Sequence, residues 1–160
     1  MAYPNTLIFV DFPSNDPEAT ARFYAEVFGW EVEGRPTGKF HRIVPGQHFL
    51  LDDGTQSPVG NLHMGIYDIA DGRPNPNGYE APALPSGNGP RVYILVSEDD
   101  TQDRILDTAE KLGATVLWRN HYWGEFNGFC GAFRDPWGTE IVLWSKGGEN
   151  PQIPDHFTRG

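Results

Sequence analysis

The sequence predicts an α+β fold made of two βαβββ modules, and three observations indicate it. An apolar, strand-like run followed by a capped amphipathic helix occurs twice, at a spacing of 84 residues. Short apolar segments of strand length follow each helix. Residues 71–90 are dense in Gly, Pro and Asn and predict an exposed connector. We therefore expect a first module at 1–70, a second at 91–146 and an irregular tail at 147–160, within one compact domain.

The first module opens with an apolar, β-branched and aromatic run at 6–12, which predicts a strand covered on both faces, with Asp11 as its one polar interruption. The helix that follows is expected to begin at Asp16, a good N-cap, with Pro17 in the first helical position. Gly29 supplies the stop signal. The remaining strands of this module are expected at 30–33, 40–44, 48–51 and 59–67.

The second module repeats this order. A strand is expected at 92–96, and Asp99 and Asp100 are the expected acidic caps of a helix that ends at Gly113, the counterpart of Gly29. The remaining strands are expected at 114–119, 128–133 and 139–144. A loop is expected at 121–124, over the mouth of a cavity or against a partner subunit. The surrounding aromatic residues are interpreted as core or interface packing: Trp118, Tyr122, Trp123, Phe126 and Phe129.

Composition excludes several classes of function. A net charge of −10 argues against nucleic acid and anionic membrane surfaces, because phosphates need cationic partners. The N-terminus lacks the pattern of a secretion signal, and no apolar run approaches the roughly 18 residues of a membrane span, so we expect a cytoplasmic protein. The single Cys130 excludes an intramolecular disulfide and a Cys-based zinc cage, and is expected to be a small apolar strand residue.

A tight turn near the C-terminus carries the most specific signal. Asp135-Pro136-Trp137-Gly138 has the residue preferences of a type I turn and leads directly into an apolar strand. Together with Asp16-Pro17-Glu18, Phe23-Tyr24 and Val27-Phe28-Gly29-Trp30, this turn resembles the vicinal oxygen chelate superfamily, which includes glyoxalase I, extradiol dioxygenases and bleomycin resistance proteins. The resemblance covers nearly the whole chain except the connector and the tail after Trp144. It implies two modules whose curved mixed sheets enclose a cavity, and often a homodimer.

The resemblance also implies where a metal would bind. Metal-using members carry His, Gln or Glu on the first and last strand of each module. The corresponding first-strand positions are Phe9 and Tyr93, or Arg91 if the second register slides by two residues. On the last strand of the first module the position is Met64 if Gly60 aligns with Gly138, and His63 only if the strand slips by one residue.

In the second module the last-strand position is Val142, and Glu140 lies two residues earlier on the same strand face. A catalytic metal needs about three protein ligands in a fixed geometry. We therefore expect no cofactor at the usual site, although His63, Glu140 and the neighbouring His41 or His48 leave a displaced divalent metal open.

Strand parity groups the remaining candidates. If Phe9 and Val142 face the cavity, their strands bring Leu7, Asp11, Glu140 and Trp144 to the same wall. Such a surface, apolar with a few polar groups, is typical of a site for a small organic ligand. Asp11 is expected to pair with Arg91 or with backbone donors. The ligand-binding candidates are Phe9, Asp11, His63, Arg91, Tyr93, Glu140, Val142 and Trp144.

Three functions follow as hypotheses. The first is a glyoxalase- or bleomycin-resistance-like protein that binds a small, partly apolar molecule in the inter-module cavity without the usual metal. The second is a metal-dependent lyase or dioxygenase of the same superfamily that uses His63 and Glu140. The third is a ligand-free interaction or regulatory module whose cavity is filled by Phe9, Tyr93 and Trp144. No catalytic residue is predicted, and no motif for a nucleotide cofactor or a serine nucleophile is present.

Overall fold

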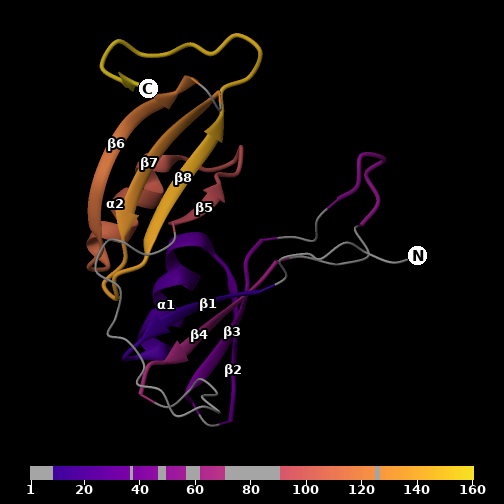
Figure 1. Ribbon diagram of the computed structural model, residues 1–160, viewed down its shortest axis with the longest axis vertical. Helices are drawn as coiled ribbons and strands as arrows, with labels where there is room; N and C mark the ends of the chain where they lie inside the picture. The colour runs from indigo at the N-terminus through magenta and orange to yellow at the C-terminus, as the bar shows by residue number, and fades with distance from the viewer. Residues whose placement is uncertain (1–8, 37, 47–49, 57–61, 71–90, 125–126) are drawn as a thin grey trace. The chain divides into compact units, whose positions relative to one another are not determined.

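The computed structural model describes residues 9–36, 38–46, 50–56, 62–70, 91–124 and 127–160. The chain divides into two compact units, residues 1–84 and 85–160, and the described residues of each form one helix and one sheet (Figure 1). The expected connector at 71–90 lies outside the described residues, as do Leu7, His48 and Phe126. No helix in the described part of the chain is long and apolar enough to cross a membrane.

The first unit has the expected βαβββ order. Its elements are β1 Phe9–Ser14, α1 Pro17–Phe28, β2 Glu31–Gly34, β3 Phe40–Val44 and β4 His63–Asp68. The sheet order is β1-β4-β3-β2, with β1 parallel to β4 and the other pairs antiparallel. Helix α1 covers one face and buries a core with Phe12, Tyr24 and Ile66. The α+β class and the modular order are therefore confirmed.

Helix α1 begins and ends where the sequence predicts. The Asp16 side chain accepts a hydrogen bond from the Ala19 N–H at 3.1 Å, and Pro17 occupies the first helical position. Gly29 has a left-handed φ of 70°, and its N–H donates to the Ala25 carbonyl at 2.8 Å.

The second unit repeats the order and adds one strand. Its elements are β5 Arg91–Leu95, α2 Gln102–Lys111, β6 Thr115–Trp123, β7 Gly128–Arg134, β8 Glu140–Lys146 and β9 Thr158–Arg159. The sheet order is β5-β8-β7-β6-β9, with β5 parallel to β8 (Figure 1). The predicted turn between β7 and β8 is confirmed: the Gly138 N–H donates to the Asp135 carbonyl at 3.1 Å.

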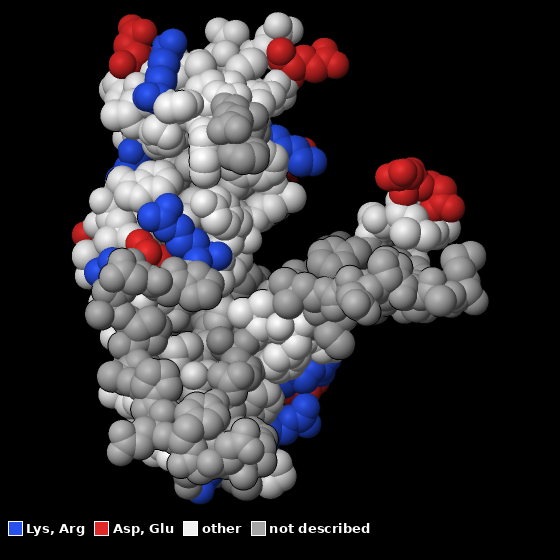
Figure 2. Space-filling view, viewed as in Figure 1, with Lys and Arg blue, Asp and Glu red and all other residues white. Residues whose placement is uncertain are grey.

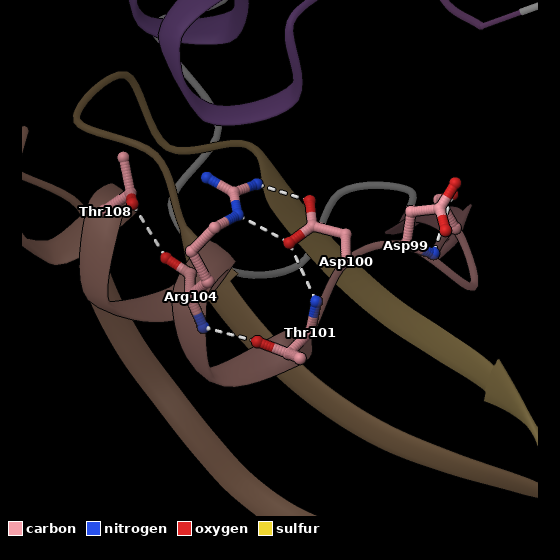
Figure 3. Close-up of polar contacts among 6 residues, drawn as sticks. Asp99, Asp100, Thr101, Arg104 and Thr108 are labelled. Carbon is pink, nitrogen blue, oxygen red and sulfur yellow. Dashed lines mark hydrogen bonds and ion pairs between the residues drawn. The ribbon is translucent and has the colours of Figure 1, made fainter.

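The predicted acidic cap of α2 is wrong, because Thr101 is the N-cap. The Thr101 hydroxyl accepts from the Arg104 N–H at 3.2 Å, while Asp100 accepts from the Thr101 N–H at 2.7 Å and pairs with the Arg104 guanidinium (Figure 3). The Asp99 N–H donates to Ser97 instead. The predicted stop of α2 is also one residue off: the helix ends at Lys111 with Leu112 as its C-cap, and Gly113 follows with a left-handed φ of 96°. The caps of the two helices are therefore offset by 85 residues at the N-terminal end and by 83 at the C-terminal end.

The second half of β6 corrects the predicted loop at 121–124. The strand continues through Trp123, across an irregularity at which Asn120 has a positive φ of 55°. Within the tail predicted to be irregular, Thr158–Arg159 form the short strand β9, which pairs in parallel with His121 and Tyr122 of β6, and the rest of the tail has no helix or strand. The Gly160 N–H donates to the Tyr122 carbonyl at 3.1 Å, and this pairing satisfies a β6 edge that would otherwise be open.

One further expected strand is absent from the described residues. Of the segment 48–51, only Leu50 and Leu51 are described, and Leu50 forms an isolated bridge with Gln56. In contrast, Cys130 is a buried residue in the middle of β7, as predicted.

Candidate functional site

The strand register of the second unit separates two faces of its sheet. Helix α2 covers one face, where Gly131 lies against Leu106 and the Gln102 side chain bonds to Ser145 at 2.9 Å. Directly paired residues share a face, so the opposite side can be read from the register. We call that opposite side the open face. It carries Arg91, Tyr93 and Leu95 of β5; Glu140, Val142 and Trp144 of β8; Cys130, Ala132 and Arg134 of β7; and Trp118, His121 and Trp123 of β6.

A hollow of about 620 Å³ lies on the open face, and the described residues that line it are Tyr93, Leu95, Trp123 and Trp144. Tyr93 is 50% exposed and Leu95 is 57% exposed. Large apolar side chains grouped on an exposed surface are characteristic of a binding site rather than of ordinary protein surface. Val142, which lies directly opposite Tyr93 on β8, is buried.

The position of the Trp144 side chain requires a glycine at residue 128. A Cβ atom added to Gly128 would lie 1.7 Å from the Trp144 Nε1 atom. The indole therefore rests directly on the β7 backbone, in the space that any larger residue at 128 would occupy. Its Nε1 atom is buried and has no hydrogen-bond partner among the described residues. Gly128 thus fixes Trp144 as part of the floor of the hollow.

A second, smaller hollow of about 280 Å³ shares the lining residue Trp123 with the first. Its other described lining residues are Arg91, Trp118, Arg119, His121 and Thr158. The His121 Nδ1 atom lies 2.8 Å from the Thr158 hydroxyl, so β9 holds this imidazole in place. The His121 and Trp118 rings also form a T-shaped contact, with centroids 5.9 Å apart.

Charged groups of the open face gather at one end of β5 and β8. The Glu140 carboxylate is 12% exposed and lies 3.8 Å from both Arg91 and Arg134. At that distance the guanidinium groups attract the carboxylate without forming hydrogen bonds. The expected Asp11–Arg91 pair is not described, because the Asp11 side chain lies outside the described atoms. Glu140 is the ion partner that the structure gives to Arg91.

The first unit brings Phe9 and His63 together. The β1–β4 register pairs these two residues directly, and Phe9 stacks on Phe40 with centroids 6.3 Å apart. The Arg42 guanidinium lies 3.1 Å from the His63 Nδ1 atom and donates to Glu33 at 2.9 Å. The bond from Arg42 holds the pKa of Glu33 below its usual range. Because a guanidinium only donates, Nδ1 of His63 is the acceptor in this contact.

The same register decides between the two alignments that the sequence left open for β4. Met64 pairs with Val10, is buried and faces helix α1, whereas His63 lies beside Phe9 on the other side of the sheet. In the second unit Tyr93 pairs with Val142 in the corresponding way. His63, and not Met64, is therefore the counterpart of Val142, since a slip of one residue exchanges the two faces of a strand.

The side chains at these four strand positions do not fit a divalent metal. Phe9 and Val142 have no donor atom, a tyrosine is a rare ligand at such sites, and the His63 Nδ1 lone pair already faces a cation. Glu140, the candidate displaced ligand, lies between two guanidinium groups. Within the described ranges, no three His, Cys, Asp or Glu residues come together in a way that would hold an ion.

The open face also contains residues that the sequence did not assign to the site. Trp118, His121 and Trp123 were interpreted as core or loop residues, yet they line the hollows. The sequence does not show which face of the sheet these three side chains occupy, because β6 changes register between Val116 and Trp118 and again between Trp118 and His121. The aromatic richness of the segment was the available signal. The five candidates that the sequence did assign in this unit all lie on the open face: Arg91, Tyr93, Glu140, Val142 and Trp144.

Comparisons with known proteins agree with this architecture. A hypothetical protein from S. aureus superposes with a TM-score of 0.65 at 14% identity, covering 90% of this chain and 95% of that one. A lactoylglutathione lyase from Agrobacterium tumefaciens gives 0.59 at 18% identity, covering 89% and 94%. A glyoxalase/bleomycin resistance protein/dioxygenase from Nocardioides gives 0.59 at 21% identity, covering 96% and 93%.

Because the sequence identities are low, these solved structures show only that the chain shares their fold. No curated protein sequence matches it significantly. The family model of the glyoxalase-like domain, however, matches residues 7–144, which include both modules and end at Trp144. The chain belongs to the glyoxalase-like domain family, within the vicinal oxygen chelate superfamily.

Proposed function

We propose that this glyoxalase-like protein binds a small, flat, apolar organic molecule on the open face of its second unit, without a metal. The observation that supports the proposal most is the hollow of about 620 Å³ lined by Tyr93, Leu95, Trp123 and Trp144. Its volume suits a small organic ligand, and aromatic walls offer a large contact area at a low cost in side-chain entropy.

Metal independence rests on the donor chemistry of the strand positions. Phe9, Tyr93 and Val142 replace the His, Gln or Glu residues that the family resemblance implies there. Binding energy must then come from apolar burial, at about 25 cal/mol per Å² of apolar surface removed from water. A flat aromatic molecule gains most from such a surface.

The two alternatives have less support. A metal-dependent lyase or dioxygenase would use His63 and Glu140, but both side chains already face arginine guanidinium groups. It predicts that His63→Ala and Glu140→Ala each abolish metal retention. A ligand-free module would need Tyr93 and Trp144 to fill the hollow, and Tyr93 is instead half exposed.

Fluorescence titration with the neutral probe phenylnaphthylamine tests the proposal. We expect saturable binding that Leu95→Glu weakens at least about tenfold, because a carboxylate on the apolar floor must be desolvated by the probe. Leu95 is exposed, so this change leaves the core intact. Leu50→Glu, at a leucine that is 65% exposed in the first unit, is the matched control and should leave the affinity unchanged.

Metal independence is tested on the same protein. After chelation, the affinity for the probe should be unchanged, and Ni, Zn, Mn or Fe salts should not bind stoichiometrically. Tight stoichiometric metal uptake accompanied by lyase or ring-cleaving turnover would contradict the proposal. Equal binding of the probe to the Leu95→Glu and Leu50→Glu variants would show that the hollow is not the site.

A further inference from the structure

The two hollows of the open face differ in chemistry. The larger is lined by apolar and aromatic side chains, whereas the smaller includes the Arg91 guanidinium and the His121 imidazole. Trp123 lines both, so a ligand that contacts this side chain lies within reach of both hollows. Arg91 and Tyr93 are alternate residues of β5, and their side chains therefore lie on the same face.

The charge balance at this end of the face is positive. The guanidinium groups of Arg91 and Arg134 share the single Glu140 carboxylate. Both contacts are 3.8 Å long, so neither guanidinium donates a hydrogen bond to that carboxylate. The Arg91 side chain is 55% exposed and remains accessible from the smaller hollow. If Arg91 turns to a ligand, Glu140 keeps Arg134 as its partner. The cluster therefore has a net charge of one positive unit, which a monoanion neutralises.

Arg119, the other guanidinium near the smaller hollow, is already committed. It donates to Asp107 at 2.7 Å and to Asp103 at 3.4 Å, and both carboxylates belong to α2. Figure 2 shows Lys and Arg side chains interspersed with acidic ones over the second unit, although the chain as a whole has a net charge of −10. An accessible guanidinium beside an aromatic hollow is thus a local feature of this acidic chain.

We propose that the ligand is an amphipathic monoanion, whose flat apolar body lies against Trp123, Trp144 and Tyr93 and whose carboxylate or sulfonate is bound by Arg91. This inference rests on the proposed function, because it specifies the ligand of the same site. A planar guanidinium suits such a group because it can donate two parallel hydrogen bonds to its oxygens. The acidic surroundings oppose anions in general, so the apolar body must contribute part of the affinity.

A matched pair of probes separates the two proposals. Anilinonaphthalene sulfonate and phenylnaphthylamine share the same aromatic body, and only the first carries an anionic group. Wild-type protein should bind the sulfonate more tightly than the neutral probe. Arg91→Gln should weaken the sulfonate about 5- to 10-fold and leave the neutral probe within about twofold, as expected for a half-exposed charge-assisted hydrogen bond. Arg91→Lys should lose less, because it keeps the charge but not the fork.

Glu140→Gln provides a gain-of-function arm. Removing the carboxylate frees both guanidinium groups, so the affinity for the sulfonate should rise several-fold while the neutral probe is unaffected. Two variants, Arg159→Gln and Glu110→Gln, control for net charge. Arg159 follows Thr158 in β9, so its side chain points to the opposite side of the sheet, and Glu110 lies on helix α2. Both should leave the sulfonate affinity within about twofold of wild type.

The outcomes are distinguishable. If both probes bind equally and neither Arg91→Gln nor Glu140→Gln alters their ratio, the anion proposal is wrong and the apolar site stands. If neither probe responds to Leu95→Glu, the proposed site itself is wrong. If Arg159→Gln weakens the sulfonate as much as Arg91→Gln does, the effect is one of overall charge, and the assignment of Arg91 is overturned.

Discussion

Gly128→Ala tests the packing that fixes the floor of the hollow. A methyl group at this position would lie 1.7 Å from Nε1, 2.5 Å from Cδ1 and 2.6 Å from Cε2 of Trp144. Non-bonded heavy atoms are normally separated by about 3.5 Å or more, so the indole must move by roughly 1.8 Å. The β7 backbone blocks movement into the sheet. Trp144 is therefore displaced away from the sheet, which is the side of the hollow.

The displacement has two measurable consequences. Overpacking at a well-filled site costs about 1–3 kcal/mol, so the free energy of unfolding in urea should fall by that amount. The displaced indole should also occupy part of the hollow of about 620 Å³ and weaken phenylnaphthylamine binding about tenfold or more. Tryptophan fluorescence and the probe titration report on the same variant.

A double-mutant cycle identifies the cause. If the clash with Trp144 is responsible, Gly128→Ala should cost less than about 0.5 kcal/mol when Trp144→Ala is already present, which corresponds to a coupling of about 1–3 kcal/mol. Gly34→Ala is the matched control, because its nearest neighbour would be the His41 ring at 3.8 Å. That control should be neutral or slightly stabilising. An equal cost of Gly128→Ala in both backgrounds would refute the reasoning.

Three further predictions concern the scaffold of the second unit. Asp135→Ala should lower the free energy of unfolding by about 2–3 kcal/mol in urea, and more than Asp135→Asn, because Oδ1 accepts from the Trp137 and Thr139 N–H groups at 2.9 and 2.8 Å; equal losses would contradict this. The hydrogen bond from Arg104 lowers the pKa of Asp100, so wild type should exceed Asp100→Asn in stability by up to about 1 kcal/mol above the usual aspartate pKa, and this advantage should disappear as the pH falls through the lowered value; a difference independent of pH would argue against the pair. Burial raises the pKa of the Cys130 thiol, so a thiol reagent should modify it far more slowly in folded protein than in urea-unfolded protein, and rapid modification of the native state would contradict its placement.

The parts of the fold that the sequence predicted correctly depend on neighbouring residues. Asp16, Pro17 and Gly29 delimit helix α1 through contacts within one or two turns, and the Asp135 turn is similarly local. The cap of α2 was missed because Asp99, Asp100 and Thr101 are all capable N-caps in sequence. The choice of Thr101 depends on Arg104, which engages the carboxylate of Asp100 and leaves the threonine hydroxyl to the helix (Figure 3).

Long-range register was harder to predict. Aligning Gly60 with Gly138 indicates Met64 and a slip of one residue indicates His63, so the sequence left both residues open. The β1–β4 register selects His63. In β6, the left-handed Asn120 interrupts the alternation, so the positions of His121 and Trp123 relative to Trp118 could not be counted from the sequence. The β9 strand has only two residues and no periodic signal.

The register of β5 against β8 shows which side chains determine the chemistry of the open face within the glyoxalase-like architecture. Tyr93 and Val142 are directly paired, and Val142 lies next to Ala132, so small apolar groups fill the centre of the face. The polar groups Arg91 and Glu140 form the neighbouring pair, two residues along each strand. A cation at the centre would meet only the phenol oxygen of Tyr93 and would lie close to two guanidinium groups, whereas an anion approaching Arg91 meets an accessible hydrogen-bond donor. Under the proposed function this arrangement favours an anion over a cation, so the sign of the response to Glu140→Gln discriminates between metal binding and anion binding.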